Sequence, residues 1–209
     1  MSSIIYAQDV RMPQFFGNGM VLQREAHIPI WGWAQAGSKL TVSINNPSNG
    51  GKTIAKAKVV ANNNGEWKVY LPKQKAGGPY KLNVLDGTDI KLSYEVFIGD
   101  VFLFSGQSNQ ELPIRRCMDK VGDLVKDYTN DHVHILKIPQ QYYFSAPQAD
   151  CKGAPWVSIS PETCSNIAAL SYFVGKELQE KEGVHVGIIN SSVGGTRVEC
   201  WVSRETLSQ

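Results

Sequence analysis

The segment 101–109 holds the residues best suited to chemistry. It reads VFLFSGQSN, so four apolar residues are followed by a short polar stretch. An apolar run of this kind predicts a buried parallel strand, and the residues after it would lie at the strand's carboxyl end, where open α/β sheets bind ligands. Ser108 is therefore predicted to be a nucleophile, and Gln107 and Asn109 are predicted to orient the loop or to contact substrate. The same residues are also typical of a plain polar turn.

A second polar loop follows another apolar run. Residues 184–189 read VHVGII and residues 190–196 read NSSVGGT. Right-handed crossovers place the carboxyl ends of consecutive parallel strands on one side of a sheet, so this loop is predicted to meet Ser108. Acyl transfer needs donors for the oxyanion, and the backbone at Gly194 and Gly195 is open to approach. A plain Gly-Gly turn is the alternative.

The two loops resemble sequence blocks of one family. Residues 106–113, GQSNQELP, resemble the first block of the sialate O-acetylesterases, a branch of the SGNH hydrolases in which this serine is the nucleophile. The resemblance extends from about residue 11 to the end of the chain. Three further segments resemble the family in the same order: 20–24 (MVLQR), 30–34 (IWGWA) and 187–196 (GIINSSVGGT), which is followed by Trp201.

The resemblance implies a carbohydrate O-acetylesterase that acts on O-acetylated sialic acid or a related acetylated sugar. Ser108 would be the nucleophile, Gly194 or Gly195 would supply the oxyanion N–H, and neither a cofactor nor a metal is expected. One alternative is a non-catalytic carbohydrate-binding module with a structural serine loop. A general α/β-hydrolase is disfavoured because Gly-x-Ser-x-Gly is absent around Ser108.

The general base is not evident in this sequence. The family draws its histidine from a late Asp-x-x-His block, which follows a Gln-Gly-Glu loop, and the chain contains neither block. Asp131 and His134 have the Asp-x-x-His spacing but lead into a predicted strand, and His185 begins another, so structural histidines are expected. We therefore expect this chain to be the N-terminal part of the enzyme, inactive alone, with the missing C-terminal half or a second chain supplying the base.

Composition excludes several other classes of function. The 209 residues carry 21 basic and 19 acidic side chains without a block of like charge, so neither nucleic-acid nor membrane binding is expected. No apolar run approaches the roughly 18 residues of a membrane span. The four cysteines lack Cys-x-x-Cys spacing, which argues against a zinc site. Free thiols are expected, with a Cys151–Cys164 disulfide as the alternative. The expected location is secreted or periplasmic, although no intact signal peptide is present.

The periodicity of apolar residues predicts two domains. Residues 1–10 are expected to be a leader remnant or a cloning-derived extension. Residues 11–95 alternate between apolar and polar side chains and predict an N-terminal β-sandwich, in which Trp31, Trp33 and Trp67 are expected to be core residues rather than a sugar-stacking platform. Residues 96–209 predict the first half of an incomplete three-layer α/β SGNH-hydrolase-like domain with a mainly parallel sheet.

Within the second domain the sequence predicts both strands and helices. Apolar spacing predicts an amphipathic helix over 114–128, weakened by Gly122, and another over 167–178 that Gly183 would end. Buried strands are predicted at 97–104, 132–138 and 184–190.

Overall fold

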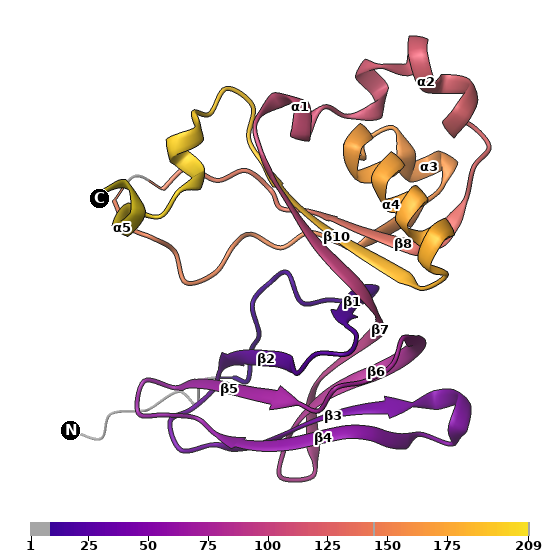
Figure 1. Ribbon diagram of the computed structural model, residues 1–209. Coiled ribbons are helices and arrows are strands. Elements are labelled where there is room, and N and C mark those ends of the chain that lie inside the picture. Colours follow the sequence, from indigo (N-terminus) through magenta and orange to yellow (C-terminus); the bar gives the residue numbers. More distant parts are fainter. Residues whose placement is uncertain (1–8, 144, 209) are drawn as a thin grey trace.

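The computed structural model describes residues 9–143 and 145–208 and has two lobes, joined by one long strand (Figure 1). Most of the predicted leader segment 1–10 lies outside the described residues. The strands are β1 (Met20–Gln23), β2 (Ile28–Trp33), β3 (Lys39–Asn46), β4 (Lys52–Val60), β5 (Glu66–Leu71), β6 (Gly77–Asp86), β7 (Asp89–Gly106), β8 (Asn130–Lys137), β9 (Val157–Ile159) and β10 (His185–Ser192). The helices are α1 (Ser108–Glu111), α2 (Met118–Val125), α3 (Pro161–Cys164), α4 (Ala169–Glu182) and α5 (Arg204–Leu207), with 3-10 turns η1 (Pro47–Asn49), η2 (Ile114–Arg116) and η3 (Val198–Trp201).

Strand β7 belongs to both lobes. Its 18 residues span about 60 Å when extended. Its first part pairs antiparallel with β6, and residues 99–106 pair parallel with β10. The result is one eight-stranded mixed sheet, ordered β4-β3-β6-β7-β10-β8-β9 with β1 also on β7, and a two-stranded sheet of β2 and β5. A separate β-sandwich is therefore not confirmed, and the predicted boundary between residues 95 and 96 falls inside β7.

Alternating side chains form the core of the N-terminal lobe. Ile28 and Ile30 of β2 are buried on the same face as Leu71 of β5, while the residues between them point outward. Trp67 belongs to this core, with 3% of its surface exposed, as predicted. Trp31 is only half-buried, however, and its ring also faces a cavity between the lobes.

In the second lobe, β7, β10 and β8 run parallel and β9 closes the edge antiparallel. Helix α4 packs on β10 and β8, with Tyr172 and Ile188 fully buried between them. It ends at Gly183, whose φ of 66° is left-handed, as predicted. These strands and helices confirm the α/β character of this lobe.

One expectation for this lobe is wrong. The helix predicted over 114–128 is broken into η2 and α2 at Cys117, whose φ of −131° and ψ of 20° are not helical. The predicted three-layer arrangement was an incomplete one, and the described residues do not complete it.

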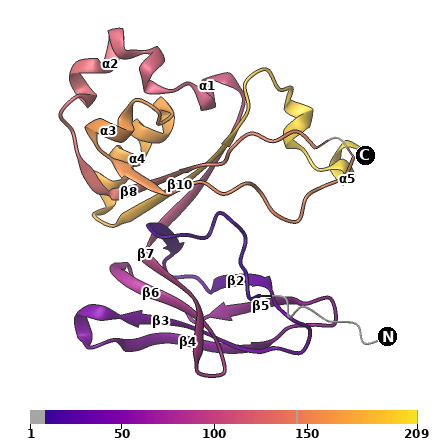
Figure 2. The same ribbon diagram turned by 180° about the vertical axis from the view of Figure 1, so that it is seen from behind.

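Helices α2, α3 and α4 of this lobe lie on one side of the sheet, whereas α5 lies apart from them beside the C-terminus (Figure 2). On the opposite face of β10, a Cβ at Gly187 would meet Val21 of β1 at 2.7 Å and Trp156 at 3.6 Å. This face is therefore covered at Gly187 by a strand and an indole ring.

All four cysteines lie in the described residues and are free thiols, so the alternative Cys151–Cys164 disulfide is not formed. Cys164 is buried, Cys117 and Cys151 are half-buried, and Cys200 is exposed. Within the described part of the chain, no helix is long and apolar enough to cross a membrane.

Candidate active site

Ser108 lies where β7 turns into the short helix α1. Gly106 makes this turn with a φ of 139°, a conformation that side chains rarely allow. Ser108 is exposed, and its hydroxyl lies 3.5 Å from Oε1 of Gln107. With Glu111, Lys137 and other residues, it lines a cavity of about 390 Å³. The serine is thus accessible to a small ligand.

The second predicted loop lies against this serine. Parallel pairing aligns Ser192 with Gly106, and the N–H of Val193 donates to the carbonyl of Gly106 at 2.9 Å. A Cβ built on Gly194 would lie 3.8 Å from both Cα and Cβ of Ser108. The structure therefore brings Ser108 and Gly194 together.

Gly195 has a different environment. Its φ is 80°, and a Cβ built there meets no atom within 4 Å. A side chain at this position would strain the backbone rather than crowd its neighbours. Gly194 is the glycine that directly faces the serine.

A carboxylate occupies the backbone donor of Gly194. Oε2 of Glu111 accepts the Gly194 N–H at 2.6 Å, and Oε1 accepts a hydrogen bond from Nε2 of Gln140. Nζ of Lys137 lies 3.9 Å from the same Oε1. Sequence reasoning missed Glu111, although its position three residues after Ser108 could have suggested that it shares the loop.

A buried polar network supports both loops from below. Nζ of Lys137 donates to Oδ1 of Asn190 at 3.2 Å and to the carbonyl and hydroxyl oxygens of Ser192 at 2.9 and 3.0 Å. Burial lowers the pKa of Lys137, and the nearby Glu111 carboxylate opposes this shift.

Asn190 carries the network to α1 and α4. Its Nδ2 donates to the hydroxyl of Ser171 at 2.9 Å and to the carbonyl of Gln110 at 3.1 Å. Sequence reasoning also missed these residues. Lys137, Asn190 and Ser192 could have been found because each is a polar residue within or at the end of a predicted apolar strand. A polar side chain that is buried there needs a hydrogen-bonding partner.

The remaining predicted site residues lie around the loop. Gln107 and Asn109 are exposed on either side of Ser108. They do not line the 390 Å³ cavity, and neither does Gly195. Their predicted catalytic or substrate-binding roles stay predictions.

Comparison with known proteins relates this geometry to a family. The chain is 30% identical to the sialate O-acetylesterase of Rattus norvegicus over 211 residues, and 29% identical to that of Homo sapiens over 209. A carbohydrate acetylesterase from Xanthomonas citri has a matching solved structure, with a TM-score of 0.83 and 34% identity over 95% of this chain. The resemblance to the sialate O-acetylesterases is confirmed.

These matches cover unequal shares of the proteins compared. They include 94% of this chain but only 38% and 39% of the rat and human proteins, and 43% of the Xanthomonas citri chain. The chain therefore spans about two fifths of the length of the curated relatives. No protein-family model matches it.

The histidines lie away from Ser108, and all four are among the described residues. His27 is exposed just before β2, in the other lobe. His185 begins β10, seven residues before Ser192, which corresponds to about 23 Å along the strand. Nδ1 of His185 lies 3.0 Å from Nε2 of His134.

The histidine cluster favours neutral imidazoles. Burial, followed by the neighbouring histidines His185 and His132, lowers the pKa of His134 to about 3. Burial and then His132 lower the pKa of His185 to about 4. His132 instead contacts Asp131, with Nδ1 2.7 Å from Oδ1. The Asp131–His134 spacing therefore does not deliver a base to the serine.

Proposed function

We propose that this chain carries the nucleophile and the oxyanion loop of a carbohydrate O-acetylesterase. Ser108 would attack the acetyl carbonyl, and backbone N–H groups around Ser108 and Gly194 would stabilise the tetrahedral intermediate once Glu111, which accepts the Gly194 N–H at 2.6 Å in this structure, releases it. The substrate would be an O-acetylated sialic acid or a related acetylated sugar, the class named for the relatives in the comparison.

One observation carries this proposal, namely the contact between the serine and the glycine loop. An exposed serine at the carboxyl end of one parallel strand lies 3.8 Å from the Cβ position of Gly194, which follows the neighbouring strand. This arrangement places a nucleophile and a backbone N–H, which Glu111 accepts in this structure, in one cavity. Similarity to acetylesterases over most of the chain supports the same chemistry.

A base would have to reach Ser108 from elsewhere. No histidine of the described residues lies at this end of the sheet, and Lys137 already donates to Asn190 and Ser192. We therefore propose that the 209-residue chain has no serine-dependent turnover by itself. Ser108 should nevertheless be acylated when a soluble base is added.

The experiment treats the 209-residue protein with an activated acetyl ester, with and without imidazole, and locates acetylated residues by peptide mass spectrometry. Imidazole should promote acetylation at Ser108, whereas Ser108→Ala should lose this product. Ser105→Ala is the matched control, because Ser105 is also exposed and lies three residues before Ser108, next to the last residue of β7. Equal acetylation of Ser105 and Ser108, or none at Ser108, would contradict a nucleophilic role.

A second assay tests the substrate and the need for an external base. Release of acetate from O-acetylated sialic acid should be absent for the chain alone and for Ser108→Ala. Multiple turnovers that depend on Ser108 would show that the chain holds its own base, and would return His134, or a histidine from a second copy, to consideration.

A further inference from the structure

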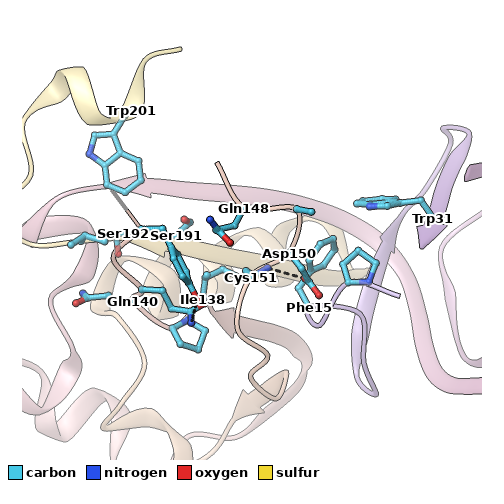
Figure 3. Close-up of a pocket in the computed structure, with 16 residues that line it drawn as sticks. Phe15, Trp31, Ile138, Gln140, Gln148, Asp150, Cys151, Ser191, Ser192 and Trp201 are labelled. Carbon is cyan, nitrogen blue, oxygen red and sulfur yellow. Dashed lines mark hydrogen bonds between the residues drawn. The ribbon is translucent and has the colours of Figure 1, made fainter. Parts of the chain in front are cut away.

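A large cavity lies between the two lobes, beside the candidate active site. Its volume is about 500 Å³, within the range of small-molecule sites. One wall comes from the N-terminal lobe, with Phe15 and Trp31, and the other from the end of β10 and from Trp201. Figure 3 shows Trp31 and Trp201 toward opposite ends of this cleft, with Gln148 and Asp150 between them.

The walls of this cleft are held in place by contacts between distant segments. Nε1 of Trp156 donates to the carbonyl of Phe15 at 2.9 Å, and the backbone N–H of Gln14 donates to Oδ1 of Asp150 at 3.0 Å. These bonds tie the connection between β8 and β9 to the N-terminal lobe. A ligand would therefore meet a preformed surface, which lowers the entropic cost of binding.

Aromatic rings supply the apolar part of the lining. Trp31 is held by Phe15 and Phe16, with ring centroids 5.6 and 5.0 Å away. Tyr143 is 55% exposed and also lines the cleft. The C–H face of a pyranose ring packs well on such flat apolar surfaces, while the polar tips of tyrosine and tryptophan still reach its hydroxyl groups.

The polar part of the lining consists mainly of amides. Gln140, Gln141 and Gln148 line the cleft, and each glutamine side chain can both donate and accept, as sugar hydroxyls require. Asp150 is the one charged residue in the lining described here, and its Oδ1 already accepts the N–H groups of Gln14 and Cys151. The chemistry fits an uncharged sugar better than an acidic one.

The cleft is connected to the serine through two sets of contacts. Gln140 lines the cleft and also donates to Glu111 in the cavity of Ser108. On the opposite wall, Nε1 of Trp201 donates to Oγ1 of Thr196 at 3.0 Å, and Thr196 in turn donates to the carbonyl of Val193. A group bound in the cleft would therefore be next to a group bound at Ser108.

We propose that the cleft is a binding subsite for a neutral glycan. The proposal rests on the proposed function, because the acetylated sugar would lie at Ser108 while the neutral sugar attached to it lies in the cleft. Trp31, Tyr143 and Trp201 provide stacking surfaces, and the glutamines bond to hydroxyl groups.

The test measures binding of lactose to the 209-residue protein by isothermal titration calorimetry, with tryptophan fluorescence as a second readout. Lactose should bind saturably and perturb the fluorescence, because two tryptophans line the cleft. Tyr143→Ala and Gln148→Ala should each weaken binding by about three- to tenfold. Galacturonate, which carries a carboxylate, should bind more weakly than lactose.

Tyr70→Ala is the matched control, because Tyr70 is also 55% exposed but lies on β5 outside the cleft. Absence of lactose binding, or equal effects of Tyr143→Ala and Tyr70→Ala, would overturn the proposal. Tighter binding of galacturonate would overturn the neutral specificity. Failure of Ser108 acetylation with lactose binding retained would count against the esterase function and not against the cleft.

Discussion

Replacement of Glu111 tests whether one carboxylate holds the glycine loop against the serine. Glu111 is the acceptor for the Gly194 N–H at 2.6 Å and for the side chain of Gln140, and it lies 3.9 Å from Nζ of Lys137. Glu111→Ala removes both hydrogen bonds and the ion pair. Glu111→Gln keeps an oxygen for Gly194 but removes the charge.

The expected loss of stability follows from these contacts. A hydrogen bond to a charged group contributes about 1.5–3 kcal/mol when it is sheltered from water. The Glu111 side chain is 29% exposed, so water replaces part of what is lost. We therefore expect Glu111→Ala to lower the free energy of unfolding by about 1–2 kcal/mol, and Glu111→Gln by about half of that.

Urea denaturation measures the global effect, and amide hydrogen exchange at Gly194 measures the local one. Exchange at this N–H should accelerate in Glu111→Ala and less so in Glu111→Gln. Asp119→Ala is the control, since Asp119 is 70% exposed and, within the described part of the chain, its ion pair is with the adjacent Lys120. This variant should change stability by less than about 0.5 kcal/mol. Unchanged stability and unchanged Gly194 exchange in Glu111→Ala would refute the idea that Glu111 anchors the loop.

Three further predictions concern the sheet, a helix and the glycine loop. The pKa of His134 is lowered from 6.5 to about 3, so the unfolded state binds more protons between these pH values, and the free energy of unfolding should fall as pH drops through this range. Urea titrations at pH 7 and pH 5 should show that the free energy of unfolding changes less with pH in His134→Phe than in the wild type. An equal change in both proteins would show that His134 is not the source of the pH dependence. Gly99→Ala should lower the free energy of unfolding by about 3 kcal/mol or more, because the added Cβ would collide with the carbonyl of His185. Gly122→Ala in α2 should raise the free energy of unfolding by about 0.5–1 kcal/mol. Similar denaturation midpoints for the two variants would contradict the close packing at Gly99. Gly195→Val should lower the free energy of unfolding by about 1–2 kcal/mol, because valine would have to adopt the left-handed φ of 80° that Gly195 has. If the variant is as stable as the wild type, this backbone conformation is not required.

Local patterns in the sequence were sufficient for most elements. Alternation between apolar and polar residues predicted β2, β3 and β5, and continuous apolar runs predicted strands at β7, β8 and β10. The run 101–104 of β7 is not buried as predicted, because Leu103 is 69% exposed and its neighbours are only half-buried. Gly183 ended α4 as expected. These predictions succeed because side-chain period and glycine conformation depend on neighbours only a few residues away. The position of Ser108 after a strand was predictable for the same reason.

Only the tertiary structure decided how the two lobes share one sheet. Nothing local distinguishes a strand that ends near residue 95 from one that continues to Gly106; the outcome depends on β6 pairing with the first part of β7 and β10 with the last. The break in the helix predicted over 114–128 was not evident from local patterns either; it lies at Cys117, whose φ of −131° is not helical.

The same distinction applies to the candidate site. The residue types of Ser108 and Gly194 suggested acyl transfer, but their contact required β7 and β10 to pair in the observed register. The roles of Glu111 and Asn190 arise from hydrogen bonds that cross 83 and 80 residues of sequence. Such partners cannot be read from local patterns, because which buried polar groups satisfy one another is determined only when distant segments pack together.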